Sequence, residues 1–121
     1  MKPINVGLIG IGTVGGGTWT VLKRNAEEIT RRAGRPIQIT AVADRNVELA
    51  KEITGGAAKV TADAFELVKD PEIDVIVELI GGYTVAKDLV MQAIANGKHV
   101  VTANFFFNDA ATTEIYTAAQ Q

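Results

Sequence analysis

The sequence predicts an α/β protein with a doubly wound parallel sheet, and three observations lead to this fold class. Short apolar segments rich in β-branched residues alternate with longer segments of helical character, as in consecutive βαβ units. A glycine-rich turn follows the first apolar segment and precedes a helical one. Further glycine and polar motifs come directly after other expected strands. Because the carboxyl ends of parallel strands meet at one edge of the sheet, this pattern is typical of the Rossmann-type fold.

The first expected βαβ unit opens the chain. The run 4–9 is apolar on both faces and too short for a helix, as in a buried parallel strand. Residues 13–33 have helical character and are expected to form one helix, which Gly34 and Pro36 bring to an end. Residues 37–43 are rich in β-branched residues and predict the second strand.

The rest of the chain continues this alternation. Asp63 is suited to cap a helix, and Gly97 is suited to end one in a left-handed conformation. The further expected strands are 59–61, 74–80 and 99–103, and the further expected helices are 47–53, 64–69 and 84–95, with moderate helical character over 108–121. Right-handed crossovers then predict the strand order 3-2-1-4-5, with a ligand crevice where strands 1 and 4 diverge.

Composition limits the classes of function. The chain has no cysteine and a single histidine, His99, which excludes disulfides, thiol nucleophiles and metal sites built from thiolates or several histidines. The net charge of −2, with both signs interspersed, argues against non-specific nucleic-acid binding. No apolar run is long enough to cross a bilayer and no signal-peptide pattern is present, so we expect a cytoplasmic protein that does not bind membranes.

The glycine-rich turn predicts a binding site for a dinucleotide, the alternative being a turn with a purely structural role. Gly10 allows a tight strand-to-helix turn, Gly12 lets the backbone approach a pyrophosphate, and Gly15 lets the helix pack closely on its strand. The helix N-terminus presents N–H groups and its positive dipole end to the phosphates. The candidate cofactor-binding residues here are Gly10, Ile11, Gly12, Thr13, Val14 and Gly15.

Asp44 and Arg45 close the second expected strand and bear on the choice of cofactor. A carboxylate at this place can accept both ribose hydroxyls of an adenosine, which favours NAD, or it can cap the next helix. The guanidinium of Arg45 can bind a 2′-phosphate, which favours NADP, stack on adenine, or lie free on the surface. The sequence leaves the choice between NAD and NADP open.

Two further motifs follow the fourth and fifth expected strands. Gly81 and Gly82 leave the backbone accessible beside the expected nicotinamide end of the crevice, or form a simple turn. Thr102 and Asn104 are candidates to hydrogen-bond the carboxamide or ribose, or to stabilise a local turn. Glu78 lies near the end of its strand and is expected to have a structural role.

Three stretches together resemble homoserine dehydrogenase, namely residues 6–15, 70–82 and 99–104. The resemblance covers residues 1–104 and implies the reversible reduction of aspartate 4-semialdehyde to homoserine with NAD(P)H, in threonine and methionine biosynthesis. It implies that all the candidate residues named above belong to the cofactor region. It also implies a full-length homo-oligomer in which a substrate and dimerisation domain follows the nucleotide-binding domain.

The chain departs from this family after Asn104. The family has a lysine there that helps bind cofactor and substrate, whereas this chain has Phe105, and the run 105–117 also departs from the family's pattern. We therefore expect residues 1–121 to be a truncated NAD(P)-binding domain, incomplete at its C-terminal end, without the substrate domain, without catalytic residues and inactive by itself.

Two alternatives remain at this point. The nucleotide domain of sugar dehydrogenases of the Gfo/Idh type has a similar first half, but it usually has Thr-Pro after the fourth strand and Glu-Lys-Pro after the fifth. The corresponding positions here are Gly81-Gly82 and Asn104-Phe105. The second alternative, from a different class, is a nucleotide-binding module without catalytic function.

Overall fold

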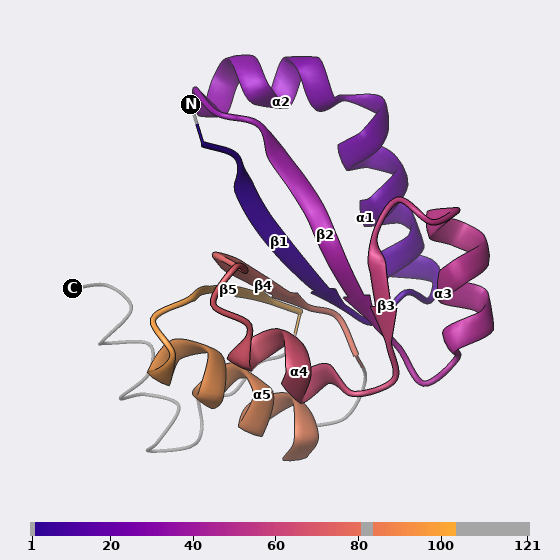
Figure 1. Ribbon diagram of the computed structural model, residues 1–121, viewed down its shortest axis with the longest axis vertical. Helices are drawn as coiled ribbons and strands as arrows, with labels where there is room; N and C mark the ends of the chain where they lie inside the picture. Colours follow the sequence, from indigo (N-terminus) through magenta and orange to yellow (C-terminus); the bar gives the residue numbers. More distant parts are fainter. Residues whose placement is uncertain (1, 81–83, 104–121) are drawn as a thin grey trace.

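A five-stranded parallel sheet forms the centre of the protein (Figure 1). The computed structural model describes residues 2–80 and 84–103. The strands are β1 (Ile4–Ile9), β2 (Ile37–Ala43), β3 (Lys59–Thr61), β4 (Val75–Glu78) and β5 (His99–Thr102). All neighbouring strands are parallel and their order is β3-β2-β1-β4-β5, which confirms the predicted fold class and strand order.

Helices cover both faces of the sheet. The helices are α1 (Thr13–Arg24), α2 (Ala26–Ala33), α3 (Val47–Thr54), α4 (Ala64–Lys69) and α5 (Thr84–Ala95). On one face, Trp19 of α1 and Ala50 of α3 pack with Leu8 of β1 in one buried cluster. On the other face, Leu67 of α4 and Leu89 of α5 pack in a second cluster. Since successive strand residues point to opposite faces, the apolar strands supply both clusters, as predicted for a doubly wound sheet.

The predicted first helix is wrong in one respect, because the structure divides it at Asn25. The backbone at Asn25 has φ −106° and ψ 22°, and both its N–H and its side-chain Nδ2 donate to the carbonyl oxygen of Val21, at 3.0 and 3.1 Å. Asparagine side chains compete in this way with the helical backbone ladder. Figure 1 shows that α2 consequently leaves the direction of α1 and lies toward the amino end of β2.

The other boundaries follow the prediction closely, and the differences lie at strand ends. β4 ends at Glu78 rather than at residue 80, and β5 ends at Thr102. The reason is the pairing register, since Ile9, the last residue of β1, is paired with Glu78, and Glu78 with Thr102. The N–H of Leu79 still donates to the carbonyl oxygen of Ile9 at 2.9 Å, although Leu79 is no longer part of the strand. The helical character predicted for 108–121 lies outside the described residues.

The helix ends that the sequence predicts have the expected conformations. The carboxylate of Asp63 accepts the N–H of Phe65 at 3.0 Å at the start of α4. Gly34 and Gly97, after α2 and α5, have φ values of 79° and 80°, a region that glycine enters without steric cost. Of the helices that the structure describes, none has both the length and the apolar character needed to span a membrane.

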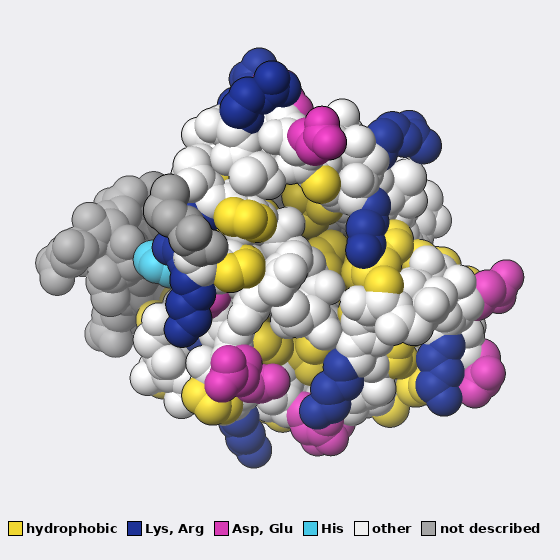
Figure 2. All heavy atoms as spheres, turned by 45° about the horizontal axis from the view of Figure 1, so that its top comes forward, with side chains coloured by type: hydrophobic (Ala, Val, Ile, Leu, Met, Phe, Trp, Pro, Cys, Tyr) yellow, Lys and Arg dark blue, Asp and Glu magenta, His cyan; other side chains and the backbone are white. Residues whose placement is uncertain are grey.

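Charges are dispersed over the surface. On the face drawn in Figure 2, acidic side chains lie between the basic ones, and these do not form a continuous patch. Glu28 of α2 pairs with both Arg31 and Arg32 one turn further on. The arginine-rich end of α2 is therefore partly neutralised within its own helix.

Candidate functional site

The glycine turn after β1 has the backbone conformation that the sequence predicts. Gly10 has φ +99°, and its N–H donates to the carbonyl oxygen of Ala43 at 2.9 Å, so the turn stays attached to the end of β2. A side chain at Gly10 is strained by this φ value, and it also meets Ile80, whose Cγ2 is 3.1 Å from the Cβ position. Gly10 therefore allows β1 to turn sharply toward α1.

Gly15 provides the close contact between this turn and the first helix. A Cβ atom built on Gly15 lies 1.9 Å from the carbonyl oxygen of Gly10 and 2.7 Å from its carbonyl carbon. Because both atoms belong to the backbone, neither can rotate away. Only glycine fits here. The close approach is between α1 and the turn at Gly10, whereas the sequence predicts it between the helix and its strand.

Gly12 differs from the other two glycines of the motif. It is the N-cap of α1, with φ −61° and ψ −154°, and no atom lies within 4 Å of its Cβ position. The fold itself therefore does not require glycine at this position. Glycine here keeps the space in front of the helix N-terminus open, as the approach of a phosphate group requires.

The N-terminus of α1 is well suited to an anion. Within the described residues, no side chain caps α1 and its first turn carries no acidic residue. Thr13 and Val14 lie in this first turn and are exposed, Val14 by 63%. Ile11 has a different role, because its side chain is fully buried in the cluster beside α1. Ile11 therefore contributes to the packing of the turn and has no exposed surface.

Asp44 connects the end of β2 to the glycine turn. Its Oδ2 accepts the N–H of Ile11 at 2.8 Å, and its Oδ1 accepts the N–H of Asn46 at 2.7 Å. Asn46 in turn caps α3 by accepting the N–H of Leu49. The carboxylate therefore accepts hydrogen bonds from two backbone amides and fixes the glycine turn to the end of β2.

A cleft of about 730 Å³ lies at the carboxyl edge of the sheet. Gly10, Gly12, Asp44 and Arg45 line it, so the structure brings together predicted residues from the ends of β1 and β2. Arg45 is exposed at this cleft. A second hollow, of about 600 Å³, lies against α1, α2, β2 and β3, and it contains none of the candidate residues.

Thr102 lies apart from the residues that line the cleft. It is the last residue of β5, and its hydroxyl donates to Oε1 of Glu78. Glu78 has no exposed surface, and its Oε2 accepts the N–H of Ile80 at 2.8 Å. The structural role expected for Glu78 agrees with these contacts. The other candidates near this end, Gly81, Gly82 and Asn104, lie outside the described residues.

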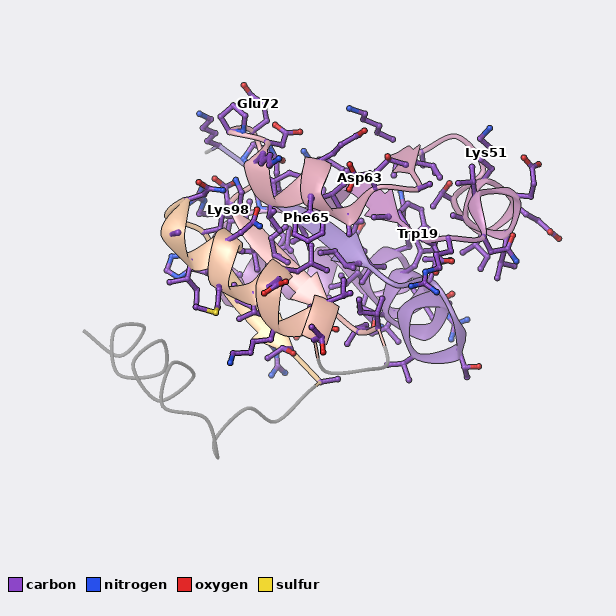
Figure 3. All side chains as sticks on the ribbon, turned by 90° about the horizontal axis from the view of Figure 1, so that it is seen from below. Trp19, Lys51, Asp63, Phe65, Glu72 and Lys98 are labelled. Carbon is purple, nitrogen blue, oxygen red and sulfur yellow. The ribbon has the colours of Figure 1, made fainter. Side chains whose placement is uncertain are left out.

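Sequence reasoning missed one wall of the cleft, formed by residues 62–65, which run from the end of β3 into the first turn of α4, and by the first turns of α5. Figure 3 places Asp63 and Phe65 on the segment that enters α4. The signal was present in the predicted topology, because this segment follows the carboxyl end of a parallel strand as the glycine turn does. The sequence predicts only a helix cap at Asp63, whereas in the structure Asp63 both caps α4 and lines the cleft.

Comparison with known proteins identifies the family. Residues 10–121 match the family described as "Homoserine dehydrogenase, NAD binding domain". The chain is similar to homoserine dehydrogenase of Methylobacillus glycogenes, with 75% identity over 104 residues, covering 86% of this chain and 25% of the relative. The similarity to homoserine dehydrogenase of Pseudomonas aeruginosa is 54% identity over 121 residues, covering 100% of this chain and 27% of the relative.

The fold agrees with the same family. The crystal structure of homoserine dehydrogenase from Thiobacillus denitrificans superimposes with a TM-score of 0.88 at 61% identity, covering 99% of this chain and 28% of that one. The chain thus spans about a quarter of the length of the relatives that it matches. These matches confirm the predicted family over the sugar dehydrogenase alternative, and they agree with NAD(P) as the cofactor. The chain belongs to the NAD-binding domain family of homoserine dehydrogenases.

Proposed function

We propose that this chain is the nicotinamide-dinucleotide-binding part of a homoserine dehydrogenase, which reduces aspartate 4-semialdehyde to homoserine with NAD(P)H. The observation that carries the proposal is the open position at Gly12. The packing of the fold requires glycine at Gly15 and Gly10, whereas Gly12 has no neighbour within 4 Å of its Cβ position. An open glycine in front of an uncapped helix N-terminus is what a bound pyrophosphate requires.

The cleft suggests how the dinucleotide lies. The pyrophosphate would bind at the first turn of α1, beside Gly12, Thr13 and Val14. The adenosine would lie toward the ends of β2 and β3, near Asp44, Arg45 and residues 62–65, which line the cleft. The nicotinamide would lie toward the ends of β4 and β5, where Gly81, Gly82, Thr102 and Asn104 are proposed to contact it.

The division of tasks follows from this placement. The cofactor, when bound, supplies the hydride, and this chain holds and orients it. Each carboxylate oxygen of Asp44 accepts one backbone amide, from Ile11 or Asn46, and keeps a second lone pair that can accept a ribose hydroxyl, while Arg45 would contact a 2′-phosphate or the adenine. The chain spans about a quarter of its relatives' length, and we propose that turnover requires the remainder of a full-length protein.

Other properties of the full-length protein are proposed on the same basis. We propose that residues 1–121 form one nucleotide-binding domain, that the full-length enzyme is a cytoplasmic homo-oligomer, and that it does not bind nucleic acid. The dispersed charges of Figure 2 and the net charge of −2 support the last point.

Calorimetric titration of the 121-residue chain with NADH and with NADPH tests the proposed function. We expect saturable 1:1 binding of at least one of the two, and competition by ADP-ribose, which shares the pyrophosphate. If circular dichroism shows that the chain is folded and neither dinucleotide binds to it, the proposed function is wrong. The ratio of the two affinities decides between NAD and NADP.

Replacing Asp44 with alanine is expected to lower both stability and cofactor affinity. The part-buried N–H of Ile11 loses its acceptor, which costs about 1–3 kcal/mol of unfolding free energy in urea denaturation. Affinity for NAD(P)H falls because the glycine turn is no longer fixed. Asp74→Ala is the matched control, since Asp74 accepts the N–H of Asn5 at 2.9 Å at the opposite edge of the sheet. Asp74→Ala should lose stability and keep its affinity for NAD(P)H. If Asp44→Ala binds NAD(P)H as tightly as Asp74→Ala does, the role given to Asp44 is contradicted.

A further inference from the structure

Glu78 is an ionisable residue in an unusual place. It ends β4 and has no exposed surface. In the pairing register it stands between Ile9 of β1 and Thr102 of β5, at the carboxyl edge of the three strands. By the alternation of strand residues it faces the same side as Ile76, which packs in the cluster beside α4 and α5. A carboxylate here therefore lies at the inner end of an apolar layer.

The contacts of Glu78 join the two chain segments that leave β4 and β5. Its side chain accepts the N–H of Ile80 at 2.8 Å and the hydroxyl of Thr102. Its carbonyl oxygen accepts the N–H of Ala103 at 3.1 Å. One residue thus fixes the backbone two positions after itself and the end of the neighbouring strand.

Ile80 connects Glu78 to the wall of the cleft. Ile80 lines the cleft, and its backbone nitrogen lies 3.3 Å from the Cβ position of Gly10, with its Cγ2 at 3.1 Å. A shift of Ile80 would therefore change the wall of the cleft on the side of β4. The buried carboxylate of Glu78 accepts the N–H of Ile80. Glu78 therefore fixes the backbone of a residue that lines the cleft, although Glu78 itself is not among the lining residues.

Burial of a carboxylate is costly, and the neighbours of Glu78 on the strand show that apolar side chains fit this sheet. Residues 75–77 are Val75, Ile76 and Val77, all buried or half-buried. Replacing Glu78 alone by an apolar residue would leave the N–H of Ile80 and the hydroxyl of Thr102 without this acceptor, which costs stability. The carboxylate therefore contributes to stability, and through its two oxygens it also fixes the ends of two neighbouring strands relative to each other.

We propose that Glu78 is a positioning residue for the nicotinamide half of the cofactor. The inference rests on the proposed function, because that half is assigned to the ends of β4 and β5. Glu78 holds Ile80 and Thr102 in one fixed arrangement at the carboxyl ends of β4 and β5. The adenosine half, toward the ends of β2 and β3, lies outside the reach of these contacts.

The test compares NADH with ADP-ribose, which is NADH without the nicotinamide ring. Calorimetry gives the dissociation constant of each for the parent chain and for Glu78→Leu, Glu78→Asp and Glu78→Gln. In the leucine and aspartate variants we expect NADH to bind about tenfold more weakly, as for the loss of one hydrogen bond to a charged group. ADP-ribose should change less than about twofold, within ordinary variation between independent sites.

Glu78→Gln separates positioning from charge. Its Oε1 can accept the N–H of Ile80 while its Nε2 donates to the hydroxyl of Thr102, so the two contacts survive without the charge. We expect this variant to keep the parent ratio of NADH to ADP-ribose affinity. If glutamine lowers the ratio as far as leucine does, charge and not positioning matters, and the proposal is overturned.

Lys98→Met is the matched control for simple loss of stability. Lys98 is a buried charged residue, 8% exposed, at the amino end of β5, where its Nζ donates to the carbonyl oxygen of Ile73 at 2.7 Å. This variant should lower the melting temperature and leave the affinity ratio unchanged. An equal fall of the ratio in Lys98→Met and Glu78→Leu would overturn the proposal.

The remaining outcomes are also decisive. If Glu78→Leu does not fold, the aspartate and glutamine variants still separate positioning from charge. Aspartate keeps the charge, but its side chain is too short to contact both Ile80 and Thr102. If all folded variants keep the parent ratio, the inference on Glu78 is wrong while the proposed function stands. If the parent chain binds neither ligand nor NADPH, the proposed function itself fails.

Discussion

Gly15→Ala is expected to lower the free energy of unfolding by about 3 kcal/mol, the upper part of the range for overpacking, and to abolish binding of NAD(P)H. The added methyl group would lie 1.9 Å from the carbonyl oxygen of Gly10. Relief requires α1 to move away from the turn, and this movement removes the packing of Trp19, which is 6% exposed, and displaces the helix N-terminus.

Urea denaturation followed by circular dichroism measures this loss, and Gly17→Ala is the control in the same helix. Gly17 is exposed and has no atom within 4 Å of its Cβ position. Alanine there should raise the free energy of unfolding by about 0.5–1 kcal/mol through helix propensity. If Gly15→Ala were as stable as the parent chain, the close contact between helix and turn would not exist in solution.

Gly12→Val is expected to leave the fold intact and to weaken NAD(P)H binding at least about 100-fold, or about 2.7 kcal/mol. The backbone at Gly12 has φ −61°, outside the left-handed region that favours glycine, and its Cβ position faces open space. The side chain would occupy the space in front of the α1 N-terminus that we assign to the pyrophosphate. The change in unfolding free energy should stay within about 1 kcal/mol, as expected for an N-cap substitution.

Calorimetric titration of Gly12→Val alongside Gly17→Ala provides the measurement. Both variants add a side chain at a position without close neighbours, one at the cleft and one further along α1. Only the first should lose affinity. If Gly12→Val binds the dinucleotide as well as Gly17→Ala does, the glycine turn is not the phosphate site.

Much of the fold could be predicted from the sequence because its signals are local. Strand boundaries at Ile4–Ile9 and Ile37–Ala43 follow from short apolar runs between glycine-rich or polar segments. The glycine spacing predicted a tight turn at Gly10 and close packing at Gly15, and the structure adds that Gly10 has a positive φ and that Gly15 approaches the turn itself. The strand order then followed from the handedness of crossovers.

The parts that could not be predicted depend on contacts between distant residues. The break at Asn25 depends on its own side chain, which donates to the carbonyl oxygen of Val21. The spacing of apolar residues along a helix carries no information about such a contact. The sequence presents Asp44 as a ribose ligand or a cap, and its bond to Ile11 joins residues 33 positions apart. The contact of Glu78 with Thr102 likewise spans 24 positions and depends on the register of β4 and β5.

The central claim is that a nicotinamide dinucleotide binds at the carboxyl edge with its pyrophosphate at the glycine turn. Titration of the 15N-labelled chain with NADPH, followed by amide chemical shifts, tests it residue by residue. We expect the largest shifts at residues 10–15 and 44–46, with smaller ones at 62–65, all at the cleft or next to it. The opposite result, with shifts centred on Leu22, Ile39 and Ala58 in the hollow beside α1 and β3 and unchanged amides at residues 10–15, would contradict the account.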